Sequence, residues 1–455
     1  MNSSRNLAVI SSKRSLFYKL SIAFFVIISL SAQSLYGMIN VKDYGATGDG
    51  VTNDTTSIQN ALFASPDAKT VYFPAGTYMI NNTLKIPDGI TVKGEGNSSI
   101  IKLMDNSTVG VDPLGTTAYS VLTNSNWTVG QRNIQIKDIV IDANKSNNSQ
   151  AMRGIILYNA KDALIDNVTV KNVKLYHGMF LFKMRDATIS NCTVTNFDGD
   201  GICIEKSTYC VVSGNHVYEG GICGGIGIEL EGRCGTNFAD YRNYHITVTG
   251  NNIHNIYGHG ILVIGTDWFS ISSNTIYAVR ANGIELLGAK FGAINGNAIG
   301  DCAKLLNGTS TRSGIKITPE DFGSGNYLGI ISCSSISITG NICSYATDYG
   351  IHVEGKNGLT HSYIAISGNI TKSNDKGGIK AEYVNEFKEK CNVMQESNKL
   401  ILGDSVSYQT SHRTNNGTPI GLIAPYYVGE ELLDTANKKW YKSTGTSDSD
   451  WVALN

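Results

Sequence analysis

Residues 178–200, GMFLFKMRDATISNCTVTNFDGD, are followed by residues 201–223, GICIEKSTYCVVSGNHVYEGGIC, and both stretches follow one pattern. Each opens with a glycine and a short run of alternating apolar residues, and each carries an asparagine further on. The opening unit recurs along most of the chain, beginning at Gly154, Gly178, Gly201, Gly225, Gly260, Gly283, Gly314, Gly350 and Gly378. The four tightest intervals between these glycines are 24, 23, 24 and 23 residues, which indicates one repeated structural unit.

A second marker is locked to the first, because an asparagine follows the glycine by 13 or 14 residues in five units. These asparagines are Asn167, Asn191, Asn215, Asn274 and Asn297. A period of this length with two or three short alternating strands predicts one solenoid coil per unit. We therefore expect an all-β fold, a right-handed parallel β-helix, with an inward ladder of asparagines at a turn. A leucine-rich horseshoe is disfavoured because neither its L-x-x-L-x-L core nor a helical segment is present.

Three units are longer than the rest, and in each the extra residues follow the glycine-led strand. The interval from Gly to Asn is 27 residues in two of them and 19 in the third. Loops near 232–245, 319–334 and 355–364 should therefore leave the coils along one edge of one sheet. Loops on one edge of a scaffold commonly build a binding wall. Their aromatic residues, such as Tyr241, are suited to stacking on sugar rings.

The first 37 residues have the pattern of a secretory signal peptide. Lys13, Arg14 and Lys19 precede an apolar run over 20–30, and small residues follow it. A membrane anchor is the alternative, but the run is shorter than the roughly 20 apolar residues that span a bilayer. We expect no membrane span after cleavage, a β-helix domain over 38–400 and an exported protein.

Composition limits the remaining function classes. The net charge is −1, so nothing indicates a nucleic-acid partner. The nine cysteines cannot all pair with one another. Cys223 and Cys234 bracket a short loop and are the best candidates for a disulfide, while small buried hydrophobic residues are the alternative interpretation. No C-x-x-C pair occurs, so the sequence predicts no metal site.

The outward positions carry the candidate chemistry. With the glycine of each coil as position 0, positions +1 and +3 are apolar and face the core, while +2 and +4 face out. This frame places Glu205 and Glu229 at +4 on consecutive coils, about 5 Å apart. One of two such carboxyl groups should have a raised pKa. A protonated acid beside an ionised carboxylate at this separation is the arrangement of retaining glycoside hydrolysis. A solvated pair of glutamates is the alternative.

Other candidates lie at the turn that enters the strand and at position +2. Asp200 and His259 occupy position −1, and His177 at the same position is a candidate base for proton abstraction. Each also fits a solvated or hydrogen-bonded turn residue. Glu285 and Lys316 fall on neighbouring coils as candidate substrate contacts or as an ordinary surface ion pair.

Three segments near the start of the chain resemble the opening of the pectate-lyase-like superfamily. They are residues 41–55 (VKDYGATGDGVTNDT), 57–62 (SIQNAL) and 71–78 (VYFPAGTY). The resemblance covers about 39–400 and implies a helix from Asp54 to Leu62 that caps a β-helix. The superfamily includes rhamnogalacturonase-like and polygalacturonase-like hydrolases, alginate C5-epimerases and phage tailspike depolymerases. This opening motif marks the fold and does not choose among those reactions.

Polygalacturonases carry Asp-Asp-Cys, Gly-His-Gly and Arg-Ile-Lys on successive coils. This chain has 200–203 (DGIC), 258–260 (GHG) and 316–318 (KIT) in that order. Asp200 and His259 match this pattern, whereas the second Asp and the Arg do not. Alginate epimerases carry Tyr-Gly-Phe-Asp-Pro-His where this chain has HGMFLF, so their catalytic set is missing.

The sequence thus favours an exported glycosidase or polysaccharide lyase, and a non-catalytic glycan-binding adhesin is the alternative, with a C5-epimerase ranked below both. The catalytic candidates are Glu205, Glu229, Asp200 and His259, and the substrate-binding candidates are His177, Glu285, Lys316 and Tyr241. A hydrolase needs no cofactor, and a lyase often uses Ca²⁺. The tail over 415–455 resembles small β-modules at the ends of tailspike-like proteins, which implies sugar contact or a homotrimer.

Overall fold

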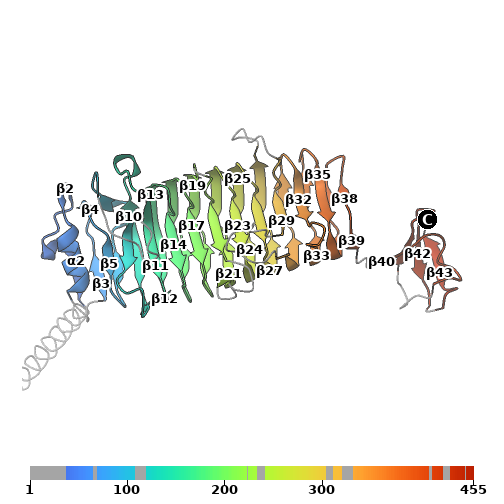
Figure 1. Ribbon diagram of the computed structural model, residues 1–455, viewed down its shortest axis with the longest axis horizontal. Coiled ribbons are helices and arrows are strands. Elements are labelled where there is room, and N and C mark those ends of the chain that lie inside the picture. The colour runs from blue at the N-terminus through green and yellow to red at the C-terminus, as the bar shows by residue number, and fades with distance from the viewer. Residues whose placement is uncertain are drawn as a thin grey trace, which may run out of the picture.

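The computed structural model describes residues 37–64, 69–107, 119–222, 224–232, 241–303, 311–319, 331–408, 412–423, 431–445 and 447–454. Residues 1–36 of the predicted signal peptide and the predicted pairing of Cys223 with Cys234 lie outside these residues. Figure 1 shows the coils stacked along the long axis of the molecule, from α2 at one end to β39 at the other. The fold is a right-handed parallel β-helix, as the repeat predicts.

The N-terminal end of the solenoid is covered by a short helix. Helix α2 spans Thr55–Phe63 and buries Ile58, Ala61 and Leu62, which confirms the helix expected from the sequence. Asp54 is fully buried before it, and its carboxylate accepts hydrogen bonds from the backbone N–H groups of Thr47 and Gly48. The motif therefore fixes the loop that leads into the helix.

One sheet of twelve parallel strands, called here sheet B, carries the glycine-led strands. Its strands are β5 (Leu84–Ile86), β8 (Tyr119–Asn124), β11 (Met152–Tyr158), β14 (Met179–Phe182), β17 (Ile202–Glu205), β20 (Ile228–Glu231), β23 (Ile261–Ile264), β26 (Ile284–Leu287), β29 (Ile315–Thr318), β32 (Tyr349–Glu354), β35 (Gly377–Glu382) and β38 (Leu400–Leu402). They pair in chain order along the axis, and 25 further strands form the remaining sides. Sheet B is therefore one continuous face that runs along the β-helix.

The register of sheet B differs from the predicted frame at one coil. An added Cβ on Gly201 would lie 2.6 Å from the carbonyl oxygen of Gly227, and one on Gly227 would lie 2.6 Å from that of Gly260. Only glycine tolerates such an approach. Gly227, and not Gly225, is therefore the position-0 glycine of its coil, and the prediction that Gly225 stands in register was wrong.

The inward asparagine ladder exists, but it begins later than predicted. Asn215 donates from Nδ2 to Oδ1 of Asn251 at 2.9 Å, and the same contact continues coil by coil. Its members are Asn215, Asn251, Asn274, Asn297, Asn341, Asn369 and Asn392. Asn167 and Asn191 are exposed and have φ of 53° and 54°, so they occupy left-handed turn positions outside the ladder.

The inserted loops leave from one edge, as predicted. Strands β20, β29 and β32 end at Glu231, Thr318 and Glu354, and each insertion follows directly. Most of the first two loops lies outside the described residues. The third forms a small turn, closed by a bridge between Lys356 and Leu359.

The C-terminal segment forms its own small sheet, set apart from the coils in Figure 1. Strands β40 (His412–Asn415), β41 (Glu431–Asp434), β42 (Lys439–Ser443) and β43 (Trp451–Leu454) make up this sheet. Leu432, Tyr441 and Trp451 form its core. In the described part of the chain, no helix has the length and apolar character that a bilayer crossing requires.

Candidate functional site

The outward face of sheet B carries an aromatic patch over β11, β14 and β17. Ile156, Phe180, Phe182 and Cys203 are buried on this outer side, with Tyr158 and Tyr241 packed beside them. The rings of Tyr158 and Phe182 stack with their centroids 4.9 Å apart. Outward side chains of neighbouring strands thus bury one another here, although the alternation of inward and outward side chains along each strand would by itself predict that they are exposed. Tyr241, predicted as a substrate contact, belongs to this patch, and the Lys206 ammonium lies 4.0 Å from its ring centroid.

A chain of polar contacts crosses three coils next to this patch. The Nε of Arg153 donates to Nδ1 of His177 at 3.3 Å, and Nε2 of His177 lies 3.1 Å from Oδ2 of Asp200. Arg153 is only 3% exposed, and its guanidinium lies 4.5 Å from the Tyr176 ring centroid and 5.1 Å from that of Phe180. These contacts fix the imidazole so that its Nε2–H points at the aspartate.

The series of polar contacts from Arg153 through His177 ends in a pair of carboxyl groups on neighbouring coils. Asp200 and Glu229 are hydrogen-bonded to each other, and Asp200 also accepts the backbone N–H of Ile226 at 2.8 Å. Burial, followed by the charge of Asp200, raises the pKa of Glu229 well above its usual value. Burial also acts to raise the pKa of Asp200, but the hydrogen bond and electrostatic attraction of His177, together with the hydrogen bonds of the Ile226 backbone and Glu229, outweigh it and the pKa is lowered. Glu229 is therefore the protonated partner, and Asp200 is the ionised one.

A thiol completes this group. Cys203 is fully buried, and its Sγ lies 3.6 Å from Oε2 of Glu229. Burial and the neighbouring Glu229 raise the pKa of this thiol well above its usual value. One donor atom each from His177, Cys203 and Glu229 lie within 4.8 Å of one another, a geometry that can hold a metal ion. Arg153, His177, Asp200, Cys203 and Glu229 are called here the central cluster.

The predicted pairing of Glu205 with Glu229 is wrong. Glu205 is in register with Glu231, and Glu229 is in register with Cys203, because the position-0 glycine is Gly227. Glu205 is 6% exposed and Glu229 is 7% exposed, so both are buried on the outer side of the sheet. The structure therefore brings Glu229 to Asp200 and leaves Glu205 beside Glu231.

His259 lies apart from the central cluster, although it shares position −1 with Asp200. The strand β20 separates them, and Nδ1 of His259 lies 3.0 Å from Oε2 of Glu285. Burial lowers the pKa of His259 against the opposing effect of Glu285. Glu285 and Lys316 are in register, yet they do not form the ion pair considered for them, since Lys316 Nζ lies 2.6 Å from Oε2 of Glu354.

A second charged group lies further along the same face, on β29, β32 and β35, and is called here the C-terminal cluster. Its members are Lys316, Asp348, His352, Glu354, Lys380 and Glu382. His352 is buried between Oδ2 of Asp348 and Oε1 of Glu382, each 3.2 Å from one ring nitrogen. Burial acts to raise the pKa of Asp348, but the interactions with His352, together with the hydrogen bonds of Lys376 and Ser313, lower it to about 2.

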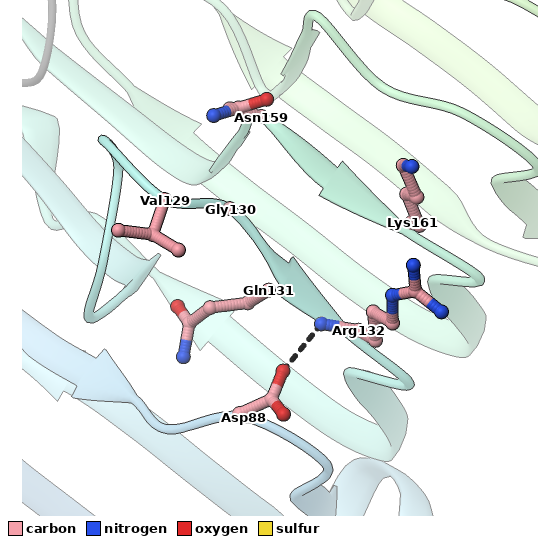
Figure 2. Close-up of a pocket in the computed structure, with 7 residues that line it drawn as sticks. All are labelled: Asp88, Val129, Gly130, Gln131, Arg132, Asn159 and Lys161. Carbon is pink, nitrogen blue, oxygen red and sulfur yellow. Dashed lines mark hydrogen bonds between the residues drawn. The ribbon is translucent and has the colours of Figure 1, made fainter.

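A pocket of about 260 Å³ opens elsewhere, beside the short sheet of β9 (Gln131–Arg132) and β12 (Ala160–Lys161). Figure 2 shows its lining, which consists of Asp88, Val129, Gly130, Gln131, Arg132, Asn159 and Lys161. Asp88 accepts the backbone N–H of Arg132 there. The lining carries one carboxylate and no imidazole, so it offers no acid–base pair.

Sequence reasoning named Asp200, Glu229 and His177 but missed two members of the central cluster. Arg153 stands at position −1, where a basic residue resembles any solvated turn residue. Cys203 stands at an outward +2 position, and for the cysteines in general the sequence left disulfides and small buried hydrophobic residues as open interpretations. The second interpretation holds for most of the cysteines, since six of the seven free thiols in the described ranges are buried.

The chain belongs to the family described as rhamnogalacturonase A/epimerase, pectate lyase-like. Residues 38–285, more than half of the chain, match this family, and residues 238–389 match the right-handed β-helix region. This result confirms the superfamily resemblance carried by the opening motif.

Curated relatives match over a limited part of the chain. The preneck appendage protein of Bacillus phage PZA is 33% identical over 118 residues, which are 26% of this chain and 12% of that protein. Mannuronan C5-epimerase AlgE4 of Azotobacter vinelandii is 35% identical over 125 residues, 25% of this chain and 21% of that protein. The chain thus matches about a fifth or less of the length of these relatives.

Solved structures extend the likeness over most of the chain. The Dettilon tailspike protein superposes with a TM-score of 0.64 at 16% identity, over 90% of this chain and 77% of that one. The Yersinia enterocolitica family 28 exopolygalacturonase gives 0.61 at 15% identity, over 80% and 78%. At these identities the likeness supports the fold.

Proposed function

We propose that this protein is an exported enzyme that binds a polysaccharide along the outward face of sheet B and hydrolyses its glycosidic bonds. The observation that carries the proposal is the hydrogen-bonded pair of Asp200 and Glu229, in which the two carboxyl groups are held in different protonation states. Paired titratable groups whose pKa values are pushed apart assign acid and base roles. Glu229 is the general acid that protonates the leaving oxygen.

The general base is another carboxylate, which lies further from Glu229 than Asp200 does. Asp200 is too close to Glu229 to leave room for a water molecule between them, and its role is to stay ionised and keep the proton on Glu229. Glu231 lies two residues further along β20, so the two side chains leave the same side of the strand from Cα atoms about 6.6 Å apart. Inverting hydrolases separate their two carboxyl groups by about 6.5–9.5 Å, a separation that side chains on this backbone spacing can reach. Glu231 is the base that activates water in this proposal.

The surroundings of the pair suit a sugar. The side chains of His177 and Asp200 keep 14% and 15% of their surface exposed, so these two side chains reach solvent. The aromatic patch with Tyr158 and Tyr241 lies beside it and offers apolar surface to a sugar ring. Relatives named as an epimerase and an exopolygalacturonase support a polysaccharide as the substrate class.

The test is a screen of the purified protein against a panel of neutral and uronate-containing polysaccharides. We expect new reducing ends without the ultraviolet absorbance of unsaturated uronate, because hydrolysis gives the first signal and elimination gives both. Proton spectra of intact uronate chains report inversion at C5, the epimerase outcome. Glycan binding without any of these three changes would replace the enzyme with the adhesin alternative.

A further inference from the structure

The central cluster places three metal-binding donor groups close together, because one ligand atom each from His177, Cys203 and Glu229 lies within 4.8 Å of the others. Nε2 of His177 lies 3.1 Å from Oδ2 of Asp200, and Sγ of Cys203 lies 3.6 Å from Oε2 of Glu229. The hydrogen bond between Asp200 and Glu229 connects the His177–Asp200 contact to the Cys203–Glu229 contact. With metal–sulfur bonds near 2.3 Å and metal–nitrogen or –oxygen bonds near 2.0–2.1 Å, the donors of a tetrahedral zinc ion stand about 3.3–3.7 Å apart. The distance of 3.6 Å between Sγ of Cys203 and Oε2 of Glu229 lies in this range, and the ligand atom of His177 lies within 4.8 Å of both residues' ligand atoms.

These donors come from strands that are held rigidly in place. His177 and Cys203 belong to coils paired through β14 and β17, and Glu229 lies on β20 in register with Cys203. Cys203 and Glu229 are buried, and His177 and Asp200 are nearly so. Preorganised ligands that need little movement favour metal binding, because the fold has already ordered them.

The donor set selects the type of ion. A thiolate and an imidazole are ligands for zinc and similar transition metals, whereas Ca²⁺ and Mg²⁺ take oxygen ligands. Two of the three donors here are sulfur and nitrogen. The site therefore does not match the Ca²⁺ that a lyase would use.

We propose that His177, Cys203 and Glu229 form a binding site for one divalent transition-metal ion of the zinc class, with Asp200 hydrogen-bonded to Glu229 beside it. The ion replaces the thiol proton of Cys203 and the proton shared by Asp200 and Glu229, and both protons leave to solvent. Because Nε2 of His177 turns to the ion, Nδ1 takes up the ring proton and gives up its hydrogen bond from Arg153. This site goes beyond the proposed hydrolysis and does not depend on it.

The experiment titrates the full chain, freed of metal by a chelator, with Co²⁺ as a spectroscopic substitute for Zn²⁺. We expect one equivalent of Co²⁺ to give a near-ultraviolet band from thiolate-to-cobalt charge transfer, and Zn²⁺ to displace it while Ca²⁺ does not. Cys203→Ser should abolish the band, and His177→Gln and Glu229→Gln should each weaken Co²⁺ binding. Partners outside the ligand shell alone are worth about 10–100-fold in affinity, so loss of a ligand should cost at least about tenfold.

The matched control is Cys391→Ser, which removes the exposed free thiol and should leave the band intact. The proposal is overturned if no charge-transfer band develops, or if the band survives Cys203→Ser. Should Cys203→Ser fail to fold, Glu229→Gln decides, because unchanged Co²⁺ affinity in that near-isosteric variant also overturns the site. If the metal-free chain cleaves no glycan while the Co²⁺ band develops as expected, the hydrolase alone is refuted. Cleavage that persists at saturating Zn²⁺ would refute the metal site, because the bound ion would keep Glu229, the proposed general acid, deprotonated.

Discussion

The central cluster and the C-terminal cluster lie on the same outward face of sheet B and are built from the same types of residue, yet their charges are balanced differently. In the C-terminal cluster each carboxylate has a cationic partner, as in Lys316–Glu354 at 2.6 Å and Lys380–Glu382 at 3.0 Å. In the central cluster two carboxyl groups face each other, and a buried thiol lies beside Glu229. The ion pairs of the C-terminal cluster join neighbouring coils. The central cluster instead holds protons that, in our proposals, are transferred to a substrate or displaced by a metal ion.

The comparison teaches that acidity alone does not identify a site on a solenoid. Asp348 is buried, and its pKa is lowered because His352 and Lys376 compensate it. Glu229 is also buried, and its pKa is raised because burial disfavours its charge and the neighbouring carboxylates Asp200 and Glu231 add to that effect. Function is to be expected where the local charges remain uncompensated.

The largest expected effect separates the two clusters by activity. Glu229→Gln removes the proposed general acid and should lower turnover about 10²–10⁴-fold, as should Asp200→Asn. Glu354→Gln in the C-terminal cluster should leave turnover nearly unchanged. Initial rates on the polysaccharide found in the screen measure this difference. Full activity of Glu229→Gln would place the chemistry elsewhere.

The same pair of variants should shift stability in opposite directions. The folded-state pKa of Glu229 lies above its unfolded value, so its contribution falls as pH rises beyond the unfolded value. A glutamine has no such loss, so Glu229→Gln should raise Tm at pH 8, whereas Glu354→Gln should lower it slightly. A lower Tm for Glu229→Gln would mean that Glu229 is ionised in the folded protein.

A second expected effect concerns pH and a buried neutral histidine of the C-terminal region. His361 accepts the backbone N–H of Cys333 at Nδ1, and burial lowers its pKa to about 4. In the unfolded chain the His361 imidazole takes up a proton near pH 6.5. The contribution of His361 to the free energy of unfolding is therefore complete above that pH and is lost as pH falls toward 4. The loss is about 3 kcal/mol.

Denaturant unfolding of the wild type and His361→Gln at pH 7, 6, 5 and 4 measures this contribution as the difference between two curves. The gap between the variants should narrow as pH falls from about 6.5 to 4. A constant gap would show that His361 keeps the same protonation state in both forms of the protein.

The smallest expected effect is the coupling within one compensated pair. Side chains of Lys316 and Glu354 are 17% and 30% exposed, so water screens their attraction. A double-mutant cycle of Lys316→Met and Glu354→Gln should give a coupling of about 0.2–1 kcal/mol in unfolding free energy. A coupling several times larger would mean that the pair is effectively desolvated, and that the C-terminal cluster does more than join neighbouring coils.

The sequence by itself determined the coil, the capping helix and the inward face. Glycine-led strands repeat at a nearly constant interval, and apolar residues at alternate positions, such as Ile202 and Ile204, have to face a core because side chains alternate along a strand. The helix at Thr55–Phe63 followed from the opening motif. Asp200, Glu229 and His177 could be named because the repeat assigns them to outward or turn positions, where polar side chains are candidates for chemistry.

Only the tertiary structure decided which acid lies beside which. The stretch 224–228 offers Gly225 and Gly227, two residues apart, and a shift of two keeps every side chain on the same face. Alternation therefore fits either register equally well. The close approach of Gly227 to the carbonyl oxygen of Gly260 selects one, and this choice moves Glu229 from beside Glu205 to beside Asp200 and Cys203. A contact between coils distant in sequence sets the site, and no local pattern encodes it.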